Sequence, residues 1–262
     1  MYILSISLAD TLPTIQMMIP PALAYQGAAQ NDSSLLRTAV QQIGLYRDVL
    51  QIKTGPITGA WRHIRGQAQS LGAWTTGNAW AALGMTRVLA TIVNFAPNSG
   101  SDFSPEIQQL TSYVYEIFDA VEASLSNATK QSGFDSSNGL LRGYLLGGEK
   151  SVLDTSLLWP GDTTGTAGIA SAMYRMAVLD PLRGQKYLGT ADSLRKAISG
   201  AINPKTGLAG PAMNPLAWWD SKPITTGSPE GQALIAMMGA SFRDCYALGP
   251  CAPPPAATTA AA

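Results

Sequence analysis

The sequence is poor in charge. Only 13% of its 262 residues are charged, and 17 basic side chains balance 17 acidic ones. A neutral chain without a basic run lacks the electrostatic footprint of proteins that bind nucleic acid or an anionic membrane. No uninterrupted apolar run approaches the roughly 20 residues that a transmembrane helix needs. We therefore expect no nucleic acid and no membrane as partners, and instead a small or neutral molecule or another protein.

Histidine and cysteine are almost absent. His63 is the one histidine, and Cys245 and Cys251 are the two cysteines. Two thiols and one imidazole do not supply the four ligands of a structural zinc site. The sequence also lacks a Gly-x-Ser-x-Gly elbow, a phosphate-binding loop and a dinucleotide fingerprint. Serine-triad hydrolysis is therefore unsupported, and we expect neither a metal nor an organic cofactor.

The two ends of the chain differ in character. Residues 1–8 are apolar but lack the basic segment and the small-residue cleavage site of a signal peptide. Residues 250–262 form a Pro/Ala/Thr tail that cannot bury enough apolar surface to fold. We expect one domain over 1–249, starting inside a fold, and a disordered tail over 250–262.

Two features favour secretion of the full-length form. Asn31-Asp-Ser33 and Asn127-Ala-Thr129 fit the acceptor pattern for N-glycosylation. In an oxidising compartment, Cys245 and Cys251 can close a short terminal loop as a disulfide. We therefore expect an extracellular location.

Apolar residues recur at helical spacing almost everywhere, and the pattern predicts two kinds of helix. One kind carries a polar face and is expected on the outside. These outer helices cover 36–50, 104–125 and 187–198. The other kind is rich in Ala, Gly and Met, has almost no charge, and is expected to be buried on most sides. These inner helices lie near 10–26, 76–93, 164–178 and 227–246. Convincing alternating strands are absent.

Three inner helices are preceded by the same tripeptide. Thr75-Thr-Gly77, Thr163-Thr-Gly165 and Thr225-Thr-Gly227 each supply capping hydroxyls and a glycine. Such a repeat suggests successive helical hairpins. If the inner helices run parallel, their N-termini meet on one face and favour anionic or oxygen-rich ligands there. The prediction is an all-α fold, an (α/α)6 toroid with about seven of its twelve helices and the rest missing upstream.

Asp10 and His63 each allow two interpretations. Asp10 lies in an apolar context, where it serves as a helix N-cap or as a carboxyl with a raised pKa that donates a proton. The two roles are compatible, because a cap on an inner helix faces the cleft. His63 is either a hydrogen-bonded loop residue or part of a site.

Three tryptophans surround this histidine in the sequence. Trp61, Trp74 and Trp80 are either core residues or platforms for sugar rings, since an indole is apolar on its face and carries an N–H at its edge. Their Gly/Thr-rich setting favours a carbohydrate-binding cleft.

The chain carries a series of motifs: Asp10-Thr-Leu-Pro13 with Pro20–Tyr25, Leu45-Tyr-Arg47, Trp61-x-His63, Trp74-x-x-Gly-Asn-x-Trp80, Gly165-Thr-Ala167 and Ser228-Pro-Glu-Gly-Gln232. Together these motifs resemble the unsaturated uronyl hydrolases of glycoside hydrolase families 105 and 88, and their sequences are closest to those of fungal members of family 105. The resemblance covers residue 8 to about residue 245.

The resemblance implies a six-hairpin glycosidase that hydrolyses pectin or rhamnogalacturonan fragments ending in a 4,5-unsaturated uronic acid. It implies that Asp10 is the catalytic acid and base. In that role Asp10 would protonate C4 of the double bond and activate the water that adds at C5. His63, Trp61, Trp74, Thr76 and Trp80 would line the subsite for the sugar.

Two departures from the family pattern define the alternatives. Thr76 stands where the family often has an arginine that holds the uronate carboxylate, and a threonine offers no charge-assisted contact; Arg62 or Arg65 would have to replace it. A second aspartate of the family would lie upstream of Met1. The alternative is therefore an inactive or truncated homologue that only binds carbohydrate. A helical-repeat interaction protein is a third interpretation, but it predicts a charged or aromatic concave surface instead of small apolar helices.

Overall fold

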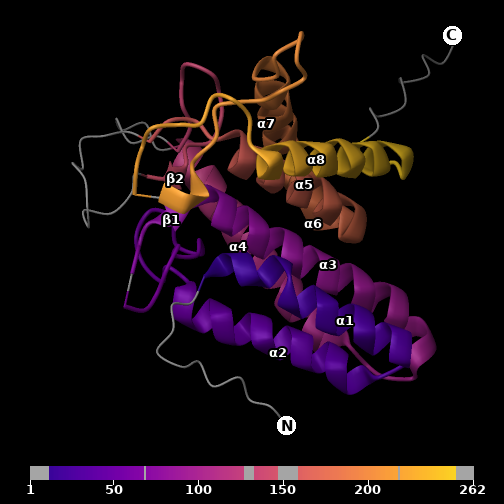
Figure 1. The fold of residues 1–262 in the computed structure, drawn as a ribbon. Coiled ribbons are helices and arrows are strands. Elements are labelled where there is room, and N and C mark those ends of the chain that lie inside the picture. Colours follow the sequence, from indigo (N-terminus) through magenta and orange to yellow (C-terminus); the bar gives the residue numbers. More distant parts are fainter. Residues whose placement is uncertain (1–11, 68, 127–132, 147–158, 218, 252–262) are drawn as a thin grey trace, which may run out of the picture.

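Helices make up most of the chain in the computed structural model, which describes residues 12–67, 69–126, 133–146, 159–217 and 219–251 (Figure 1). The elements are the 3-10 helix η1 (Pro13–Met17), α1 (Ile19–Gln30), α2 (Ser33–Leu50), β1 (Ala73–Trp74), α3 (Thr75–Ser99), α4 (Ser104–Ser126), β2 (Tyr144–Leu145), α5 (Thr163–Leu179), α6 (Pro181–Gly184), η2 (Gln185–Tyr187), α7 (Leu188–Gly200), η3 (Pro215–Ala217) and α8 (Pro229–Ala247). Among the described residues, seven helices have 12 residues or more. The all-α prediction is confirmed.

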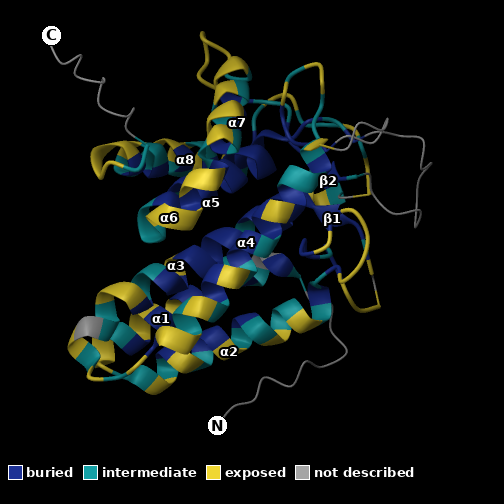
Figure 2. Ribbon diagram, turned by 180° about the vertical axis from the view of Figure 1, so that it is seen from behind, coloured by how far each residue is buried: buried dark blue, intermediate teal, exposed yellow. Residues whose placement is uncertain are grey.

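The helices form an inner and an outer layer. α1, α3, α5 and α8 are neighbours in that order, while α2 packs on α1, α4 on α3 and α7 on α5. Figure 2 shows α5 buried almost throughout, whereas α2 and α7 carry exposed outer faces. This is the layering that the two kinds of apolar pattern predict.

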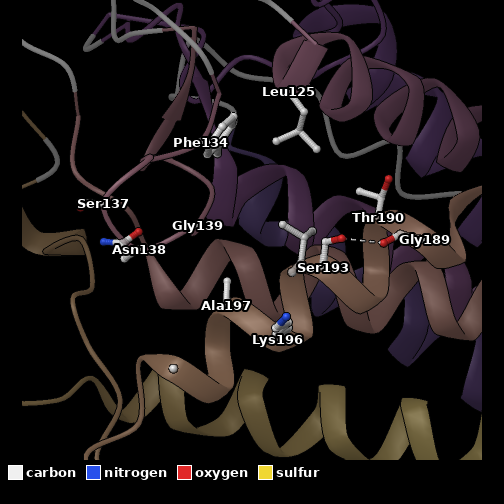
Figure 3. A pocket seen from close by; sticks show the side chains of 12 residues that line it. Leu125, Phe134, Ser137, Asn138, Gly139, Gly189, Thr190, Ser193, Lys196 and Ala197 are labelled. Carbon is white, nitrogen blue, oxygen red and sulfur yellow. Dashed lines mark hydrogen bonds between the residues drawn. The ribbon is translucent and has the colours of Figure 1, made fainter.

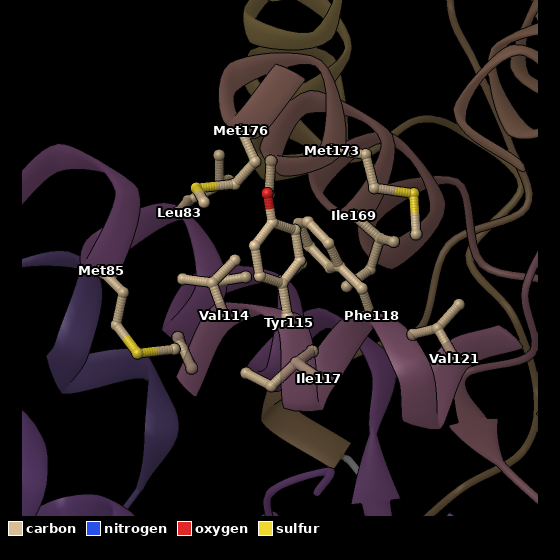
Figure 4. Close-up of a cluster of buried hydrophobic side chains, with 14 of the residues drawn as sticks. Leu83, Met85, Val114, Tyr115, Ile117, Phe118, Val121, Ile169, Met173 and Met176 are labelled. Atoms are coloured by element: carbon tan, nitrogen blue, oxygen red, sulfur yellow. The ribbon is translucent and has the colours of Figure 1, made fainter. Parts of the chain in front are cut away.

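The core lies where α3, α4 and α5 meet (Figure 4). One face of α4 presents Val114, Ile117, Phe118 and Val121, all fully buried. Residues spaced by three or four positions share one side of a helix, so the periodicity of the sequence becomes a continuous packing surface.

The N-terminal ends of the inner helices approach one another very closely. A Cβ on Gly165 would lie 2.7 Å from Cγ2 of Thr75, and one on Gly231 would lie 3.1 Å from Oγ1 of Thr164. A side chain at Gly165 would force α3 and α5 apart, and one at Gly231 would make an unusually tight contact between α5 and α8. The inner helices therefore begin on one common face, beside β1 and β2 (Figure 1).

The helix starts differ in detail from the prediction. Thr75-Thr-Gly77 and Thr163-Thr-Gly165 form the first turns of α3 and α5 instead of preceding them. Thr225-Thr-Gly227 precedes α8, and Ser228 caps that helix by accepting a hydrogen bond from the Gly231 N–H. Gly227 has a φ of +97°, a backbone conformation that favours glycine.

The first inner segment is interrupted. Among the described residues it begins as η1, and the regular helix α1 starts only at Ile19. Pro20 and Pro21 explain the restart, because proline has no N–H to donate and is tolerated only in the first turn of a helix. The helix expected from Asp10 is thus divided, and Asp10 itself lies outside the described residues.

Two strands of two residues each, β1 and β2, pair antiparallel, with Ala73 opposite Leu145 and Trp74 opposite Tyr144. Sequence periodicity did not predict them, because two residues are too few to show an alternating pattern. They matter for position, since β1 leads directly into α3.

The disulfide, the apolar part of α3 and the C-terminal tail can each be compared with the sequence-based expectations. Cys245 and Cys251 form the expected disulfide at the end of α8. Within the described residues, the Thr75–Ala96 part of α3 is long and apolar enough to cross a membrane, but much of it is buried, as in a core helix. Residues 252–262 lie outside the described part, so the tail remains a prediction.

Candidate active site at the N-termini of the inner helices

An aromatic cluster surrounds His63. The Nδ1 of His63 and the hydroxyl of Tyr144 are hydrogen-bonded over 2.7 Å, and the imidazole centroid lies 4.5 Å from the ring centroid of Trp74. Tyr144 in turn contacts Trp159, with ring centroids 4.8 Å apart. The pairing of β1 with β2 places Trp74 opposite Tyr144, so both side chains lie beside His63.

Burial keeps the members of this cluster uncharged. It lowers the pKa of His63 to about 4 and raises the pKa of Tyr144. Only 3% of His63 is exposed, and a charged imidazolium would lose its hydration there. His63 is therefore a neutral residue that positions Trp74 and Tyr144 at neutral pH.

Thr76 is tied to a buried carboxylate. Its hydroxyl donates a hydrogen bond to Oδ2 of Asp162 over 2.7 Å. Asp162 is the N-cap of α5 and also accepts from the N–H groups of Thr164, Gly165 and Met213. Four donors thus compensate a carboxylate that is fully buried.

Trp80 lies one turn further along α3 and is half-buried. Its indole nitrogen is buried and makes no hydrogen bond of standard geometry. Even so, the indole interacts with the carboxyl of Glu230, in the first turn of α8, and this interaction lowers the pKa of Glu230. Burial raises the pKa of Glu230 most, the negative charge of Asp162 raises it further, and the indole offsets only part of this rise.

Trp61 is placed differently from the other tryptophans. Its side chain is fully buried in the main core. The side chain of Asn78 is also fully buried. It accepts a hydrogen bond from the backbone N–H of Trp61 over 2.7 Å and donates to the backbone carbonyls of Trp61 and Trp74 over 2.9 Å each. In the structure Trp61 thus packs the loop before β1 against α3.

The two arginines considered as replacements at Thr76 lie in that same loop. Arg62 donates to the carbonyl of Leu71, and Arg65 is exposed. A third arginine, Arg142, is 8% exposed and donates to the carbonyl of Trp159 beside the aromatic cluster. Sequence reasoning did not single out Arg142, because no local pattern marks a residue just before a two-residue strand.

The structure describes all predicted site residues except Asp10. His63 contacts Trp74, while Trp74, Thr76 and Trp80 share the start of α3. Pro13 packs against this start, since a Cβ on Gly77 would lie 3.1 Å from its Cγ. Pro13, the second described residue, therefore lies at the N-terminal end of α3, which carries Trp74 and Trp80.

Asp162 was not singled out from the sequence, and Glu230 was noted only as part of the Ser228–Gln232 motif, without a role of its own. A signal was present for both. Asp162 directly precedes Thr163-Thr-Gly165 as an N-cap residue, and Glu230 follows Ser228-Pro229 as a first-turn acid. What the sequence could not show is that α3 and α8 bring Trp80 and Glu230 together across α5.

Two cavities lie elsewhere. One of about 860 Å³ lies on the outer side, between the end of α4, the 133–139 segment and α7 (Figure 3). Leu125, Phe134 and Ala197 form part of its apolar lining. The other, of about 1000 Å³, lies between α1, α3, α5 and α8 towards their C-terminal ends. Of the predicted site residues that the structure describes, none lines either cavity.

Comparison by sequence finds no matching protein-family model and no matching curated protein. Comparison by structure finds clear similarity. A possible member of glycoside hydrolase family 105 from Klebsiella pneumoniae aligns with a TM-score of 0.68 at 18% identity, over 90% of this chain and 57% of that one. A family 88 glycosyl hydrolase from Bacteroides vulgatus gives 0.67 at 10% identity, over 90% and 63%. A polysaccharide lyase gives 0.67 at 12% identity, over 91% and 62%.

These alignments show the fold, which is that of the six-hairpin α/α toroid. The chain spans less than two thirds of the length of these proteins. Since hydrolases and a lyase share the architecture, the reaction has to be inferred from the site.

Proposed function

We propose that the chain belongs to a glycoside hydrolase that removes the unsaturated uronic acid from the non-reducing end of pectin or rhamnogalacturonan oligosaccharides. The observation that carries the proposal is that Trp74 and Trp80 lie at the start of α3, where the indole of Trp80 interacts with Glu230 of α8. Aromatic faces bind the apolar faces of sugar rings, and the polar groups between them bind hydroxyls.

The proposed reaction hydrates the double bond. Asp10 donates a proton to C4 of the vinyl ether and then accepts one from the water whose oxygen bonds to C5. The hemiketal that results opens and releases the neighbouring sugar. The role of Asp10 comes from the family resemblance alone, since Asp10 lies outside the described residues.

We further propose an extracellular, fungal setting for the full-length protein. The Cys245–Cys251 disulfide supports the location, since such bonds persist in oxidising compartments. Extracellular pectin lyases would supply oligosaccharides with the required double bond.

The proposal is tested with an unsaturated rhamnogalacturonan disaccharide. Incubation with the chain should remove the ultraviolet absorbance of the double bond, and Asp10→Asn should abolish this loss. Asp48→Asn, at an exposed position on α2, is the matched control and should retain full activity. Loss of absorbance that persists in Asp10→Asn would refute the assignment of the acid.

A second candidate function is carbohydrate binding without hydrolysis. Thr76 favours this function, because by the resemblance it stands in place of an arginine and its hydroxyl is already hydrogen-bonded to Asp162. Calorimetry with the same disaccharide separates the two functions. Binding without any loss of absorbance would identify a binding protein, and the absence of both would refute a site for unsaturated uronyl sugars.

A further inference from the structure

The chain between Ala212 and Ile224, just before α8, forms a loop whose two ends meet. The N–H of Ala212 donates to the carbonyl of Ile224 over 3.0 Å, and the N–H of Ile224 donates to the carbonyl of Ala212 over 2.8 Å. Apart from Trp218, which lies outside the described residues, the structure describes this 212–224 loop throughout. Because the two ends are paired, the position of the loop depends on what holds those ends.

The base of the 212–224 loop is fastened to the start of α5. Thr163, the first residue of α5, donates both its N–H and its hydroxyl to the carbonyl of Pro211 over 2.9 Å each. The N–H of Met213 donates to Oδ1 of Asp162, the N-cap of the same helix, over 3.2 Å. The loop therefore stands on the face where the inner helices begin.

Met213 also joins this loop to the aromatic residues of the candidate site. Its buried side chain belongs to a cluster with Trp74, Tyr144 and Trp159, separate from the main core. A Cβ on Gly143 would lie 2.5 Å from Cγ of Met213, so the methionine packs directly against the residue before β2. Figure 1 shows the loop, in orange, beside β1 and β2.

The outer part of the loop exposes two large apolar side chains. Leu216 is 87% exposed and Trp219 is 46% exposed. The backbone that carries them is held by short-range hydrogen bonds, because Oδ1 of Asn214 accepts from the Leu216 N–H over 3.0 Å and the Asp220 N–H donates to the Ala217 carbonyl over 2.8 Å. A surface that is already ordered loses little conformational entropy when a ligand binds.

The chemistry of this outer part suits a sugar ring. An indole offers an apolar face to the C–H groups of a sugar and an N–H at its edge. The charged residues of the loop, Asp220 and Lys222, are opposite in sign, so the loop neither attracts nor repels an ionic ligand as a whole. Trp219 is six residues from Met213, a span of at most about 20 Å, which brings it within reach of an oligosaccharide that begins beside Trp74.

On the basis of the proposed function, we propose that Trp219 and Leu216 form an outer subsite for the oligosaccharide. It binds sugar rings on the reducing side of the terminal unsaturated disaccharide. The unsaturated uronic acid lies at the start of α3, and the sugar chain extends outward past Met213. A later ring stacks on the indole of Trp219, and Leu216 enlarges the apolar surface beside it.

The inference predicts that the affinity depends on the length of the oligosaccharide. An unsaturated tetrasaccharide should bind about tenfold more tightly than the unsaturated disaccharide, because only the longer ligand reaches Trp219. Trp219→Ala should remove this gain and leave the affinity for the disaccharide unchanged. Trp219→Phe keeps an aromatic face and should retain part of the gain, and Leu216→Ala should lose a smaller part of it.

The experiment is calorimetry with both oligosaccharides on the full chain carrying Asp10→Asn, which prevents turnover. Tyr246→Ala is the matched control, because Tyr246 is an aromatic residue near the far end of α8 and is 54% exposed. This control should leave both affinities unchanged. Thermal melting of each variant verifies that the fold is retained.

Three outcomes would contradict these expectations in different ways. Equal affinity of the parent chain for the two lengths, or equal weakening of both by Trp219→Ala, would overturn the inference and leave the proposed function intact. A change of oligomeric state in Trp219→Ala, measured by light scattering, would also overturn it, because the exposed side chains would then join two copies of the chain. Absence of binding to either oligosaccharide would overturn the proposed function itself.

Discussion

The hydroxyl of Thr76 donates to Oδ2 of Asp162 over 2.7 Å and so joins the first turn of α3 to the N-cap of α5. Both residues are almost completely buried. Thr76, whose hydroxyl the sequence placed in a sugar subsite, thus connects two inner helices in the structure.

Replacing Thr76 by valine tests the structural value of this bond. Valine has nearly the same shape, so the change removes the hydroxyl and leaves one position on a buried carboxylate unfilled. We expect the free energy of unfolding to fall by about 1.5 to 3 kcal/mol, the usual range for a hydrogen bond to a charged group. Thr76→Ser retains the hydroxyl and should cost less. Urea denaturation measures both, and a valine variant as stable as the wild type would contradict the expectation.

Asn78 offers a second test, because one buried amide fastens the loop containing Trp61 and His63 to α3. Asn78→Ala removes a partner from a buried backbone N–H and from two backbone carbonyls, and we expect a loss of about 2 to 4 kcal/mol. Asn78→Asp should be worse, since it sets a carboxylate against two carbonyl oxygens. Asn94→Ala, at an exposed position of the same helix, is the control and should change stability little. Chemical denaturation monitored by tryptophan fluorescence compares all three variants.

The buried imidazole predicts a pH dependence of stability. The pKa of His63 is lowered from 6.5 to about 4 in the folded protein, so between these values the unfolded chain binds a proton that the folded chain does not. Stability from this residue is therefore complete above pH 6.5 and is lost progressively as the pH falls towards 4, by about 3 kcal/mol in all. His63→Gln should be less stable at neutral pH but should show a smaller decline over this interval. Parallel slopes for the two proteins in denaturation at several pH values would exclude the imidazole as the source.

Helix positions could be read from the sequence with good accuracy because they depend on local spacing. The runs at 36–50 and 104–125 correspond to α2 and α4. The strands β1 and β2 could not be read in this way. Each pairs with a segment some 70 residues away, and two residues carry no periodic signal of their own.

The site was predicted in part. The sequence marked the segment from Trp61 to Trp80, but periodicity alone does not distinguish an aromatic side chain in the core from one near a cleft. The structure places Trp61 in the core and Trp80 beside Glu230. The roles assigned to Asp10, His63, Trp74, Thr76, Trp80 and Trp61 in catalysis and sugar binding stay predictions that the experiments above address.

By itself, the sequence determined the helical class, the two layers and the glycines at the helix starts, because each of these depends on residue type and on neighbours within a few positions. Only the tertiary structure decided which acids meet which aromatic residues. Thr76, Asp162 and Glu230 belong to three different helices, and they meet because Gly165 and Gly231 allow the N-termini of those helices to come within contact distance. That convergence is set by close packing across long sequence separations.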